Sequence, residues 1–405
     1  MELSYPLLLD AATGTQLQKH GMPAGVCAEK WTLENPDVIL AVQREYVAAG
    51  SRVLYTPTFG ANRVKLEANG LFNKVEDFNL RLAGLSREAA GGRAWVAGDI
   101  APTGLFLYPL GDTSFEELVE IYTEQAAALE KAGVDLFVIE TMMTVAEARA
   151  AVLAVRSVSK KPVFVSFTVN EQGKTLMGSD ITAVLQIMQG MGISAFGLNC
   201  STGPDAMAVQ LQRLHEIARV PLIAKPNAGV PEVENGETVY RCTPDEFTAF
   251  VSEMLEAGVM IFGGCCGTTA AHLQALQAAL SRAVPSVPQP KHTDLLPCAT
   301  EKELFFLDPS VPVGEALPCD EDLEENLEEA LENDDPVVTI AIRDASELDN
   351  FADVQYSITK PLCLQCDDSD LLEQALRLYQ GRALYDGSLS DEELLPLADR
   401  YGLII

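Results

Sequence analysis

Three cysteines are placed where they can bind a soft metal ion. Cys200 ends an apolar run, and Cys265 and Cys266 form an adjacent pair between Gly264 and Gly267. Three protein ligands with an open fourth position are typical of catalytic zinc sites, and thiolates favour zinc over magnesium or calcium. The flanking glycines permit the sharp turn that two adjacent ligands need. The alternatives are three small core residues, the usual place of a free cysteine, or a vicinal disulfide.

Converging thiols require elements that bring distant segments together. Before residue 290 the chain repeats one pattern, in which a short apolar run is followed by a helical stretch such as 37–49, 116–132, 145–158 or 244–257. Strands alternating with helices imply parallel pairing with right-handed crossovers, and eight units in this length predict an α/β fold, a closed (β/α)8 TIM barrel. An open doubly wound sheet is the alternative, although its glycine-rich fingerprint is missing after the first run. The runs are 5–10, 52–58, 94–99, 136–141, 162–168, 195–200, 221–225 and 259–264.

In such a barrel, chemistry lies at the C-terminal ends of the strands. This rule selects a set of polar residues and brings the ends of the sixth and eighth strands to one rim, one strand apart. The three thiols are therefore expected to converge. The selected residues are Asp10, Thr56, Thr58, Asn62, Asp99, Glu140, Asn199, Cys200, Asn227 and the segment 263–267.

These rim segments resemble the zinc-dependent homocysteine S-methyltransferase family. Within that family they are most like the N-terminal homocysteine-binding domain of cobalamin-dependent methionine synthase. The likeness covers residues 1–285, and the Gly-Gly-Cys-Cys-Gly turn and the Asn-Cys strand end occur in the expected order. The segments that carry it are 9–15, 55–62, 98–104, 140–141, 197–200, 225–229 and 263–267.

The resemblance implies a role for each matching residue. Cys200, Cys265 and Cys266 would bind Zn²⁺, with the amide oxygen of Asn227 as a fourth ligand until the thiol of homocysteine replaces it. Glu140 would pair with the ammonium of the substrate, and Asp10 would order the first loop and the amino-acid end of homocysteine. Backbone groups of Ala11 and Ala12 would face the substrate carboxylate, and Thr58 and Asn199 complete the implied substrate-binding set. The less favoured alternatives are a helix N-cap for Asp10 and an ordinary rim carboxylate for Glu140.

The methyl donor is a separate expectation. A quaternary ammonium donor is usually held by an aromatic cage, and the rim offers only Tyr55, Phe59 and Phe106. We therefore expect methylcobalamin carried by a separate corrinoid protein or by other methionine synthase modules. A small sulfonium or ammonium donor, a different thiol substrate, and an inert barrel that serves as an assembly module remain the alternatives.

The net charge is distributed unevenly along the chain. From Lys291 onward there are 7 basic and 28 acidic residues, which gives −21 of the total −31. The strand–helix repeats predict a barrel over residues 1–286, and the change in composition predicts a proline-broken linker over 287–314 and a smaller acidic α/β module over 315–405. Leu323, Leu327 and Leu331 place one apolar stripe on an acidic helix, which favours a solvated face of a docked helix over a partner surface.

The last third faintly resembles the first strand–helix units of a pterin-binding barrel, but about 110 residues cannot close a second barrel. Strands are expected at 337–342, 361–366, 383–386 and 403–405, with helices at 369–379 and 390–401. Cys363 and Cys366 have the spacing of a redox motif. They lie within one of these strands, where their side chains point to opposite faces.

The net charge of −31 argues against nucleic acid and anionic membranes as partners. No apolar run is long enough for a transmembrane helix, and no secretory signal is recognised. Nine cysteines in such a chain favour a reducing, cytoplasmic location.

Overall fold

The computed structural model describes residues 4–234, 237–283, 288 and 290–405. These residues form two compact units, one made of residues 1–176 and 194–289 and the other of residues 177–193 and 290–405. Each unit is described here by itself.

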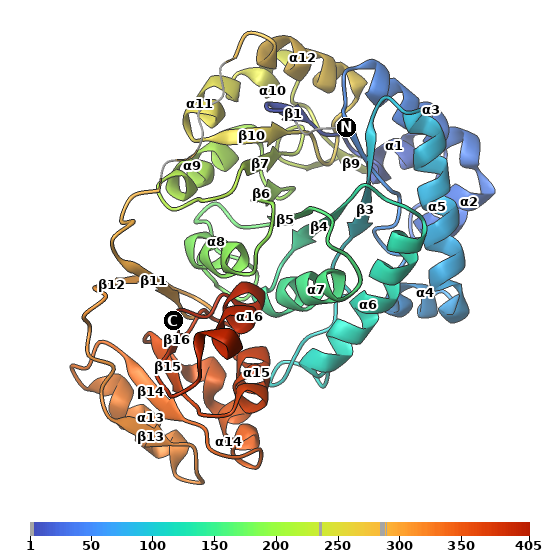
Figure 1. Ribbon diagram of the computed structural model, residues 1–405. Coiled ribbons are helices and arrows are strands. Elements are labelled where there is room, and N and C mark those ends of the chain that lie inside the picture. Colours follow the sequence, from blue (N-terminus) through green and yellow to red (C-terminus); the bar gives the residue numbers. More distant parts are fainter. Residues whose placement is uncertain (1–3, 235–236, 284–287, 289) are drawn as a thin grey trace. The chain divides into compact units, whose positions relative to one another are not determined.

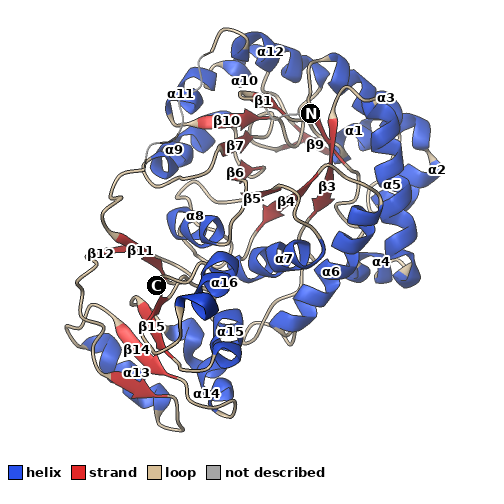
Figure 2. Cartoon of the chain, viewed as in Figure 1, coloured by secondary structure: helices blue, strands red, loops and turns tan. Residues whose placement is uncertain are grey.

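The first unit is built on eight parallel strands that helices surround (Figures 1 and 2). All neighbouring strands pair in parallel, in the order β1-β10-β7-β6-β5-β4-β3-β2. The two end strands approach each other, because the Arg52 N–H donates to the Leu8 carbonyl over 2.8 Å. The expected TIM barrel and all eight predicted strands are thereby confirmed. The strands are β1 Leu7–Leu8, β2 Val53–Tyr55, β3 Trp95–Ile100, β4 Leu136–Met142, β5 Val163–Phe167, β6 Ala195–Asn199, β7 Leu222–Lys225 and β10 Val259–Phe262.

Alternate strand residues fill the barrel interior. Val53 and Tyr55 of β2 and Leu136 and Val138 of β4 belong to one buried cluster with apolar residues from the other strands. Side chains two residues apart share one face of a strand, so this alternation directs one set into the barrel. The interior is a packed core, which leaves the C-terminal rim (the ring formed by the C-terminal ends of the eight strands) as the place for a site.

Helices follow the strands as expected, and capping residues mark many of their ends. The Ser114 and Thr144 hydroxyls accept hydrogen bonds from the N–H groups of Glu117 and Glu147 and so cap α6 and α7. Gly50, Gly133, Gly192 and Gly258 all have positive φ, the left-handed conformation in which many helices end on a glycine. The helices of this unit are α1 Gly14–Lys19, α2 Ala28–Glu34, α3 Pro36–Ala48, α4 Arg63–Glu67, α5 Val75–Ala90, α6 Phe115–Lys131, α7 Val145–Val158, α9 Pro204–His215, α10 Pro244–Thr248, α11 Val251–Glu256 and α12 Ala270–Leu280.

The prediction of one continuous helical stretch over 244–257 was wrong, because the structure has two helices there, α10 and α11. The hydroxyl of Thr248 donates to the carbonyls of Pro244 and Asp245, at 3.1 and 3.2 Å. A hydroxyl that donates to carbonyls of the preceding turn competes with the backbone hydrogen bonds of the helix. Here it lies at the end of α10, where the helix is interrupted. A short antiparallel pair, β8 Glu232–Glu234 and β9 Glu237–Val239, precedes α10.

The second unit contains a four-stranded parallel sheet with consecutive strand order, β13-β14-β15-β16. The strands expected at 337–342, 361–366 and 383–386 and both expected helices are present, whereas β13 was not anticipated. The last expected strand is reduced to one bridge between Leu384 and Ile404. The elements are α8 Ile181–Gly190, β11 Leu296–Ala299, β12 Leu304–Leu307, β13 Ala316–Pro318, α13 Leu323–Glu332, β14 Val338–Ala341, α14 Glu347–Val354, β15 Leu362–Gln365, α15 Ser369–Leu378, β16 Leu384–Tyr385 and α16 Asp391–Tyr401.

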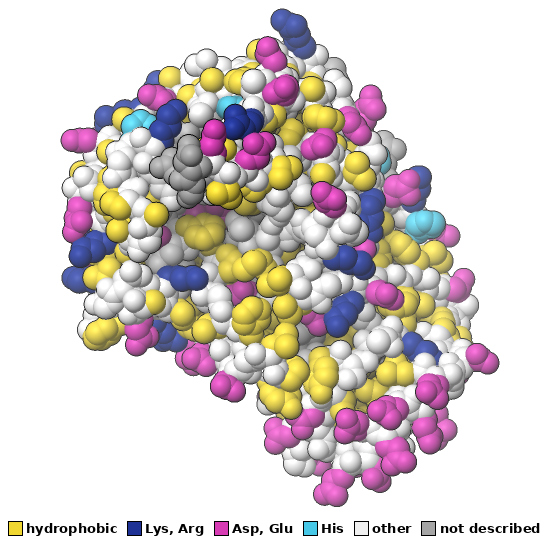
Figure 3. Space-filling view, turned by 180° about the vertical axis from the view of Figure 1, so that it is seen from behind, with side chains coloured by type: hydrophobic (Ala, Val, Ile, Leu, Met, Phe, Trp, Pro, Cys, Tyr) yellow, Lys and Arg dark blue, Asp and Glu magenta, His cyan; other side chains and the backbone are white. Residues whose placement is uncertain are grey.

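Acidic side chains cover much of the surface of the second unit (Figure 3). Leu323 and Leu327 of α13 are buried, while the charged residues between them face solvent, which agrees with a docked amphipathic helix. Within 287–314, the segment predicted as a linker, β11 and β12 form an antiparallel pair. The domain boundaries drawn from the sequence, 1–286, 287–314 and 315–405, stay a prediction.

Cys363 and Cys366 have different surroundings within this unit. Cys363 belongs to a buried cluster with Cys298, and the Cys366 thiol donates to the Asp368 carbonyl. No helix in the described part of the chain has the length and apolarity that crossing a membrane requires.

Candidate functional site

The three cysteines singled out from the sequence meet at the C-terminal rim. The sulfur atoms of Cys200, Cys265 and Cys266 all lie within 4.8 Å of one another. Cys200 follows β6 and the Cys265–Cys266 pair follows β10, with β7 between the two strands in the sheet. The convergence predicted from strand order is therefore confirmed, and these are sulfur positions that one metal ion can bridge.

Backbone hydrogen bonds from neighbouring strand ends hold the cysteines in place. The Cys200 N–H donates to the Lys225 carbonyl over 3.1 Å, and the Cys265 N–H donates to the Pro226 carbonyl over 2.8 Å. The Cys266 carbonyl accepts from the Ala228 N–H over 2.9 Å. Both thiol segments are thus fixed to the end of β7, so the sulfur positions depend on the closed rim and not on either loop alone.

Local backbone conformation marks the site as strained. Thr141, Cys200 and Ser201 have φ values of 60°, 62° and 57°, a region that residues with a side chain rarely adopt. Gly267 has φ 79°, and a Cβ there would lie 2.3 Å from the ring of Tyr240. The glycine after the cysteine pair is therefore required both by its conformation and by the close approach of that ring.

Burial and mutual contacts raise the pKa values of the three thiols. The hydrogen bond with Cys265 lowers the pKa of Cys200, but the bond with Cys266 and burial outweigh it and raise that pKa to about 11. For Cys266, the hydrogen bond with Cys200 lowers the pKa, and Cys265 together with burial raises it to about 11. The hydrogen bond with Cys200, followed by burial, raises the pKa of Cys265 well above its usual range. A metal ion binding here must displace protons.

Asn227 lies between Pro226 and Ala228, whose backbone groups hold Cys265 and Cys266. Its side chain is buried, and its Oδ1 has no hydrogen-bond partner. Its N–H donates to the Thr202 carbonyl over 3.2 Å, in the segment that follows Cys200. A buried amide oxygen without a partner is costly, and a metal ion is one way to satisfy it.

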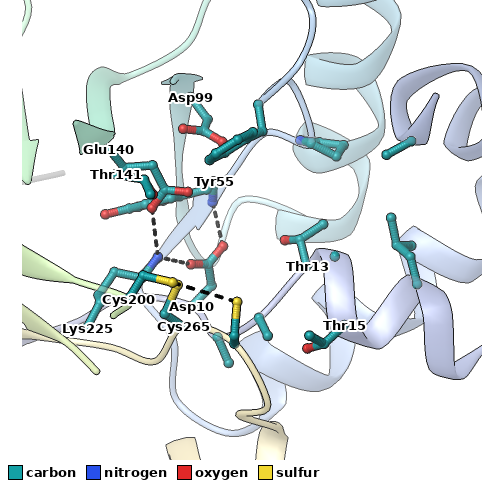
Figure 4. Close-up of a pocket in the computed structure, with 18 of the residues that line it drawn as sticks. Asp10, Thr13, Thr15, Tyr55, Asp99, Glu140, Thr141, Cys200, Lys225 and Cys265 are labelled. Carbon is teal, nitrogen blue, oxygen red and sulfur yellow. Dashed lines mark hydrogen bonds and ion pairs between the residues drawn. The ribbon is translucent and has the colours of Figure 1, made fainter. Parts of the chain in front are cut away.

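The sulfurs line a pocket of about 290 Å³ together with charged residues from other strand ends (Figure 4). Of the predicted site residues, Asp10, Ala11, Ala12 and Glu140 line it with the three cysteines. The pocket therefore joins the thiol cluster to the residues expected at the amino-acid end of a substrate.

Asp10 is fixed by two contacts and does not cap a helix. Its Oδ2 accepts from the Tyr55 N–H over 2.7 Å, and its Oδ1 lies 3.1 Å from the Lys225 ammonium. Burial raises the pKa of Asp10, and the Lys225 charge opposes that rise. The carboxylate thus ties β1 to β2 and β7 at the rim.

Lys225 was not assigned a role from the sequence, although it ends an apolar strand at the rim. The side chain is buried, and its ammonium lies 3.7 Å from Glu140 Oε2 and 3.5 Å from the centre of the Tyr55 ring. Burial alone lowers the pKa of Lys225, but Tyr55, Asp10 and Glu140 outweigh burial and raise it. Lys225 is therefore the counter-charge of two carboxylates.

Three residues of the implied metal- and substrate-binding set lie outside the described pocket lining. Thr58 is buried and donates to the Asp99 carbonyl, over 2.7 Å. Asn199 accepts from the Thr141 N–H at 2.9 Å and donates to Thr141 Oγ1 at 2.7 Å and toward the Cys265 sulfur at 3.9 Å. Asn227 is the third. Thr58 and Asn199 thus support neighbouring strand ends, and their contact with substrate stays a prediction.

Backbone groups of the first loop are partly engaged. The Ala12 N–H donates to Thr268 Oγ1 over 3.2 Å, and the Ala12 carbonyl accepts from the Tyr46 hydroxyl. Neither Ala11 nor Ala12 has a positive φ. Tyr240, another residue without a sequence signal, shares a hydrogen bond with Cys266.

Comparison with known proteins places this chain among methyltransferases. Residues 7–280 match the family described as Homocysteine S-methyltransferase. The chain is 34% identical over 293 residues to methionine synthase of Mycobacterium leprae and 33% identical over 290 residues to methionine synthase of Mycobacterium tuberculosis, covering 67% of this chain in both cases. The aligned region spans about a quarter, 24%, of the length of each of these relatives.

Solved structures agree with the sequence comparison. The homocysteine methyltransferase MmuM from Escherichia coli is similar in its oxidized form, with a TM-score of 0.58 and 25% identity. Its metallated form gives a TM-score of 0.57, and both matches cover 67% of this chain and 95% of MmuM.

Proposed function

Because the chain belongs to the homocysteine S-methyltransferase family, we propose that it transfers a methyl group to the sulfur of homocysteine and so forms methionine. The observation that carries this proposal is the single pocket in which three convergent thiols face Asp10 and Glu140. Such a pocket offers one end to a sulfur atom and the other to an α-amino acid.

Zn²⁺ is the proposed metal. The residues fit it, because three soft sulfur donors lie within 4.8 Å of one another and a buried amide oxygen nearby has no partner. Cys200, Cys265 and Cys266 would hold the ion, with Asn227 as the exchangeable ligand. When bound, zinc holds a thiol as its thiolate, the nucleophilic form, at neutral pH.

The chain itself supplies binding and orientation. Glu140 receives the ammonium of homocysteine, while Asp10 fixes the loop that carries Ala11 and Ala12, whose backbone faces the substrate carboxylate. The substrate sulfur is thereby directed toward the three cysteines and toward the incoming methyl group. In the transfer a sulfur–carbon bond forms as the donor–carbon bond breaks, and the electron pair of that bond stays on the donor. No proton moves, so no general base is assigned.

We propose methylcobalamin, carried by a separate corrinoid protein or another methionine synthase module, as the donor. The names of the two mycobacterial relatives support a methionine synthase system. The Lys225 ammonium lies over the Tyr55 ring, so this ring is already engaged by a cation and is not free to cage a quaternary ammonium donor. A small sulfonium or ammonium donor is the second candidate, and a cytoplasmic location without nucleic-acid or membrane partners stays a prediction.

The test is methionine formation from homocysteine with methylcobalamin, betaine and S-methylmethionine supplied side by side. We expect turnover with methylcobalamin, one zinc ion per chain, and loss of both in Cys265→Ala. Turnover with betaine or S-methylmethionine alone would replace the donor assignment. Substoichiometric zinc after careful purification, or full activity in Cys265→Ala, would overturn the metal site. If Cys200→Ser binds a corrinoid protein normally and the unaltered chain never turns over, the barrel is an assembly module.

A further inference from the structure

The pocket contains more buried carboxylates than it has cations to balance them. Asp10, Asp99 and Glu140 line it, and Lys225 is the one lysine or arginine among its described lining residues. A fourth acid, Glu29, is already engaged, since its Oε1 accepts from the Gly60 N–H over 2.6 Å. Buried charges need partners, so the excess of carboxylates over cations in this pocket needs a physical explanation.

Lys225 is shared unequally between Asp10 and Glu140. Its ammonium is 3.1 Å from Asp10 but 3.7 Å from Glu140, which is longer than a hydrogen bond. Two carboxylate oxygens remain buried without a hydrogen-bond partner, Oε2 of Glu140 and Oδ1 of Asp99. Asp99 and Glu140 come from the ends of β3 and β4, which are paired neighbours in the sheet.

The Asp99 carboxyl is not needed to anchor its own strand. The Asp99 N–H donates to Thr56 Oγ1 over 2.9 Å, and the Asp99 carbonyl accepts from Thr58 Oγ1 over 2.7 Å. These backbone contacts fix the residue and leave its side chain available to the pocket, where Figure 4 shows it. Burial and then the charge of Glu140 raise the pKa of Asp99, which means that its ionised form is disfavoured. A cation bound beside both carboxylates would stabilise that form.

We propose that Asp99 is a second acceptor for the substrate ammonium, and that Asp99 and Glu140 together select thiols that carry an α-ammonium group. This inference rests on the proposed function, because it assigns the substrate end of the same pocket. Lys225 lies within hydrogen-bond distance of Asp10 and forms only a longer ion pair with Glu140, and the ligand brings the positive charge that Asp99 lacks and a hydrogen-bond donor for Glu140 Oε2. A thiol of the same length without an ammonium leaves the Asp99 carboxylate without a cation and binds poorly.

The experiment compares two ligands on the zinc-loaded full chain by calorimetry: L-homocysteine and 4-mercaptobutyrate, which lacks the ammonium. The variants are Asp99→Asn and a matched control, Asp112→Asn, which makes the same change at an exposed residue in the loop after β3. We expect Asp99→Asn to weaken homocysteine binding about tenfold or more and to change 4-mercaptobutyrate binding less than about twofold. Asp112→Asn is expected to leave both affinities unchanged.

Equal effects of Asp99→Asn on both ligands, or no effect on either, would overturn the proposal. If that variant does not fold, Asp99→Ser is measured, and if both fail, the unaltered chain decides: equal affinity for the two ligands refutes ammonium selection. Failure of the proposed function looks different, because then neither thiol binds and no methionine forms. Asp99 can thus be rejected while methyl transfer to homocysteine stands.

Discussion

Replacing Lys225 by methionine tests the charge network on which the pocket depends. The side chain of Lys225 is only 4% exposed and that of Asp10 only 1%, so the pair is removed from solvent at its 3.1 Å separation. Methionine keeps an unbranched apolar stem but leaves the carboxylates of Asp10 and Glu140 without their counter-charge. Breaking a buried pair from one side costs about 3–5 kcal/mol of unfolding free energy near neutral pH, roughly 6–20 °C in Tm for a unit of this size.

The pH dependence of that cost gives a sharper test. Burial already raises the pKa of Asp10 and Glu140, and loss of Lys225 removes the charge that lowers both. An acid whose pKa is higher in the folded than in the unfolded state stabilises folding fully only below its unfolded pKa. Its contribution is lost as the pH rises through the folded pKa. We therefore expect the penalty of Lys225→Met to be small near pH 4 and to grow toward pH 8.

The assay is denaturant unfolding followed by tryptophan fluorescence. Both tryptophans, Trp31 and Trp95, belong to the barrel unit, so their signal reports that unit alone. The control is Lys161→Met, which breaks a pair with Glu130 at 2.9 Å whose side chains are 31% and 33% exposed and which is expected to cost about 0–1 kcal/mol. A second change, Asp10→Asn in the Lys225→Met background, should recover part of the loss. Equal penalties for the two lysines, or a penalty constant from pH 4 to 8, would refute the reasoning.

Four further predictions concern the metal site. Cys200→Ser should lower the bound zinc well below one ion per chain. The control Cys27→Ser, which changes a cysteine outside the cluster, should retain its zinc. Metal analysis after gel filtration compares the two variants. Gly267→Ala should destabilise more than Gly25→Ala, because both have φ near 80° but only Gly267 meets the Tyr240 ring, whereas the space beside Gly25 is open. Backbone strain alone costs about 1–2 kcal/mol, so thermal melts that shift equally would contradict the clash. Removal of zinc by a chelator should lower the Tm of the barrel, because a ligand that binds only the folded state stabilises it. A Tm unchanged by chelation would argue against a resident metal. Asn227→Ala should reduce the zinc affinity measured in a competition titration.

Strand–helix alternation and rim position were enough to predict much of this protein. Eight apolar runs separated by helical stretches identify the barrel, because parallel strands with right-handed crossovers have few other ways to close. The same rule places Cys200 and the Cys265–Cys266 pair at one rim, since the side chains at strand ends follow directly from strand order. The helix ends at Gly50, Gly133, Gly192 and Gly258 can also be read from the sequence, because each depends on the left-handed conformation of a single glycine.

Tertiary structure alone decided how the charges at the rim are shared. Lys225, Asp10 and Glu140 are far apart in sequence, and only closure of the barrel shows that the lysine lies nearer Asp10 than Glu140. The strand-end position of Asn199 predicts a place at the rim, and only the fold shows that its amide contacts the backbone and hydroxyl of Thr141. The orphaned oxygen of Asp99 is likewise invisible in the sequence. A residue type and its strand position fix which rim it occupies, whereas its partners depend on side-chain directions from several strands at once, and those exist only in the folded barrel.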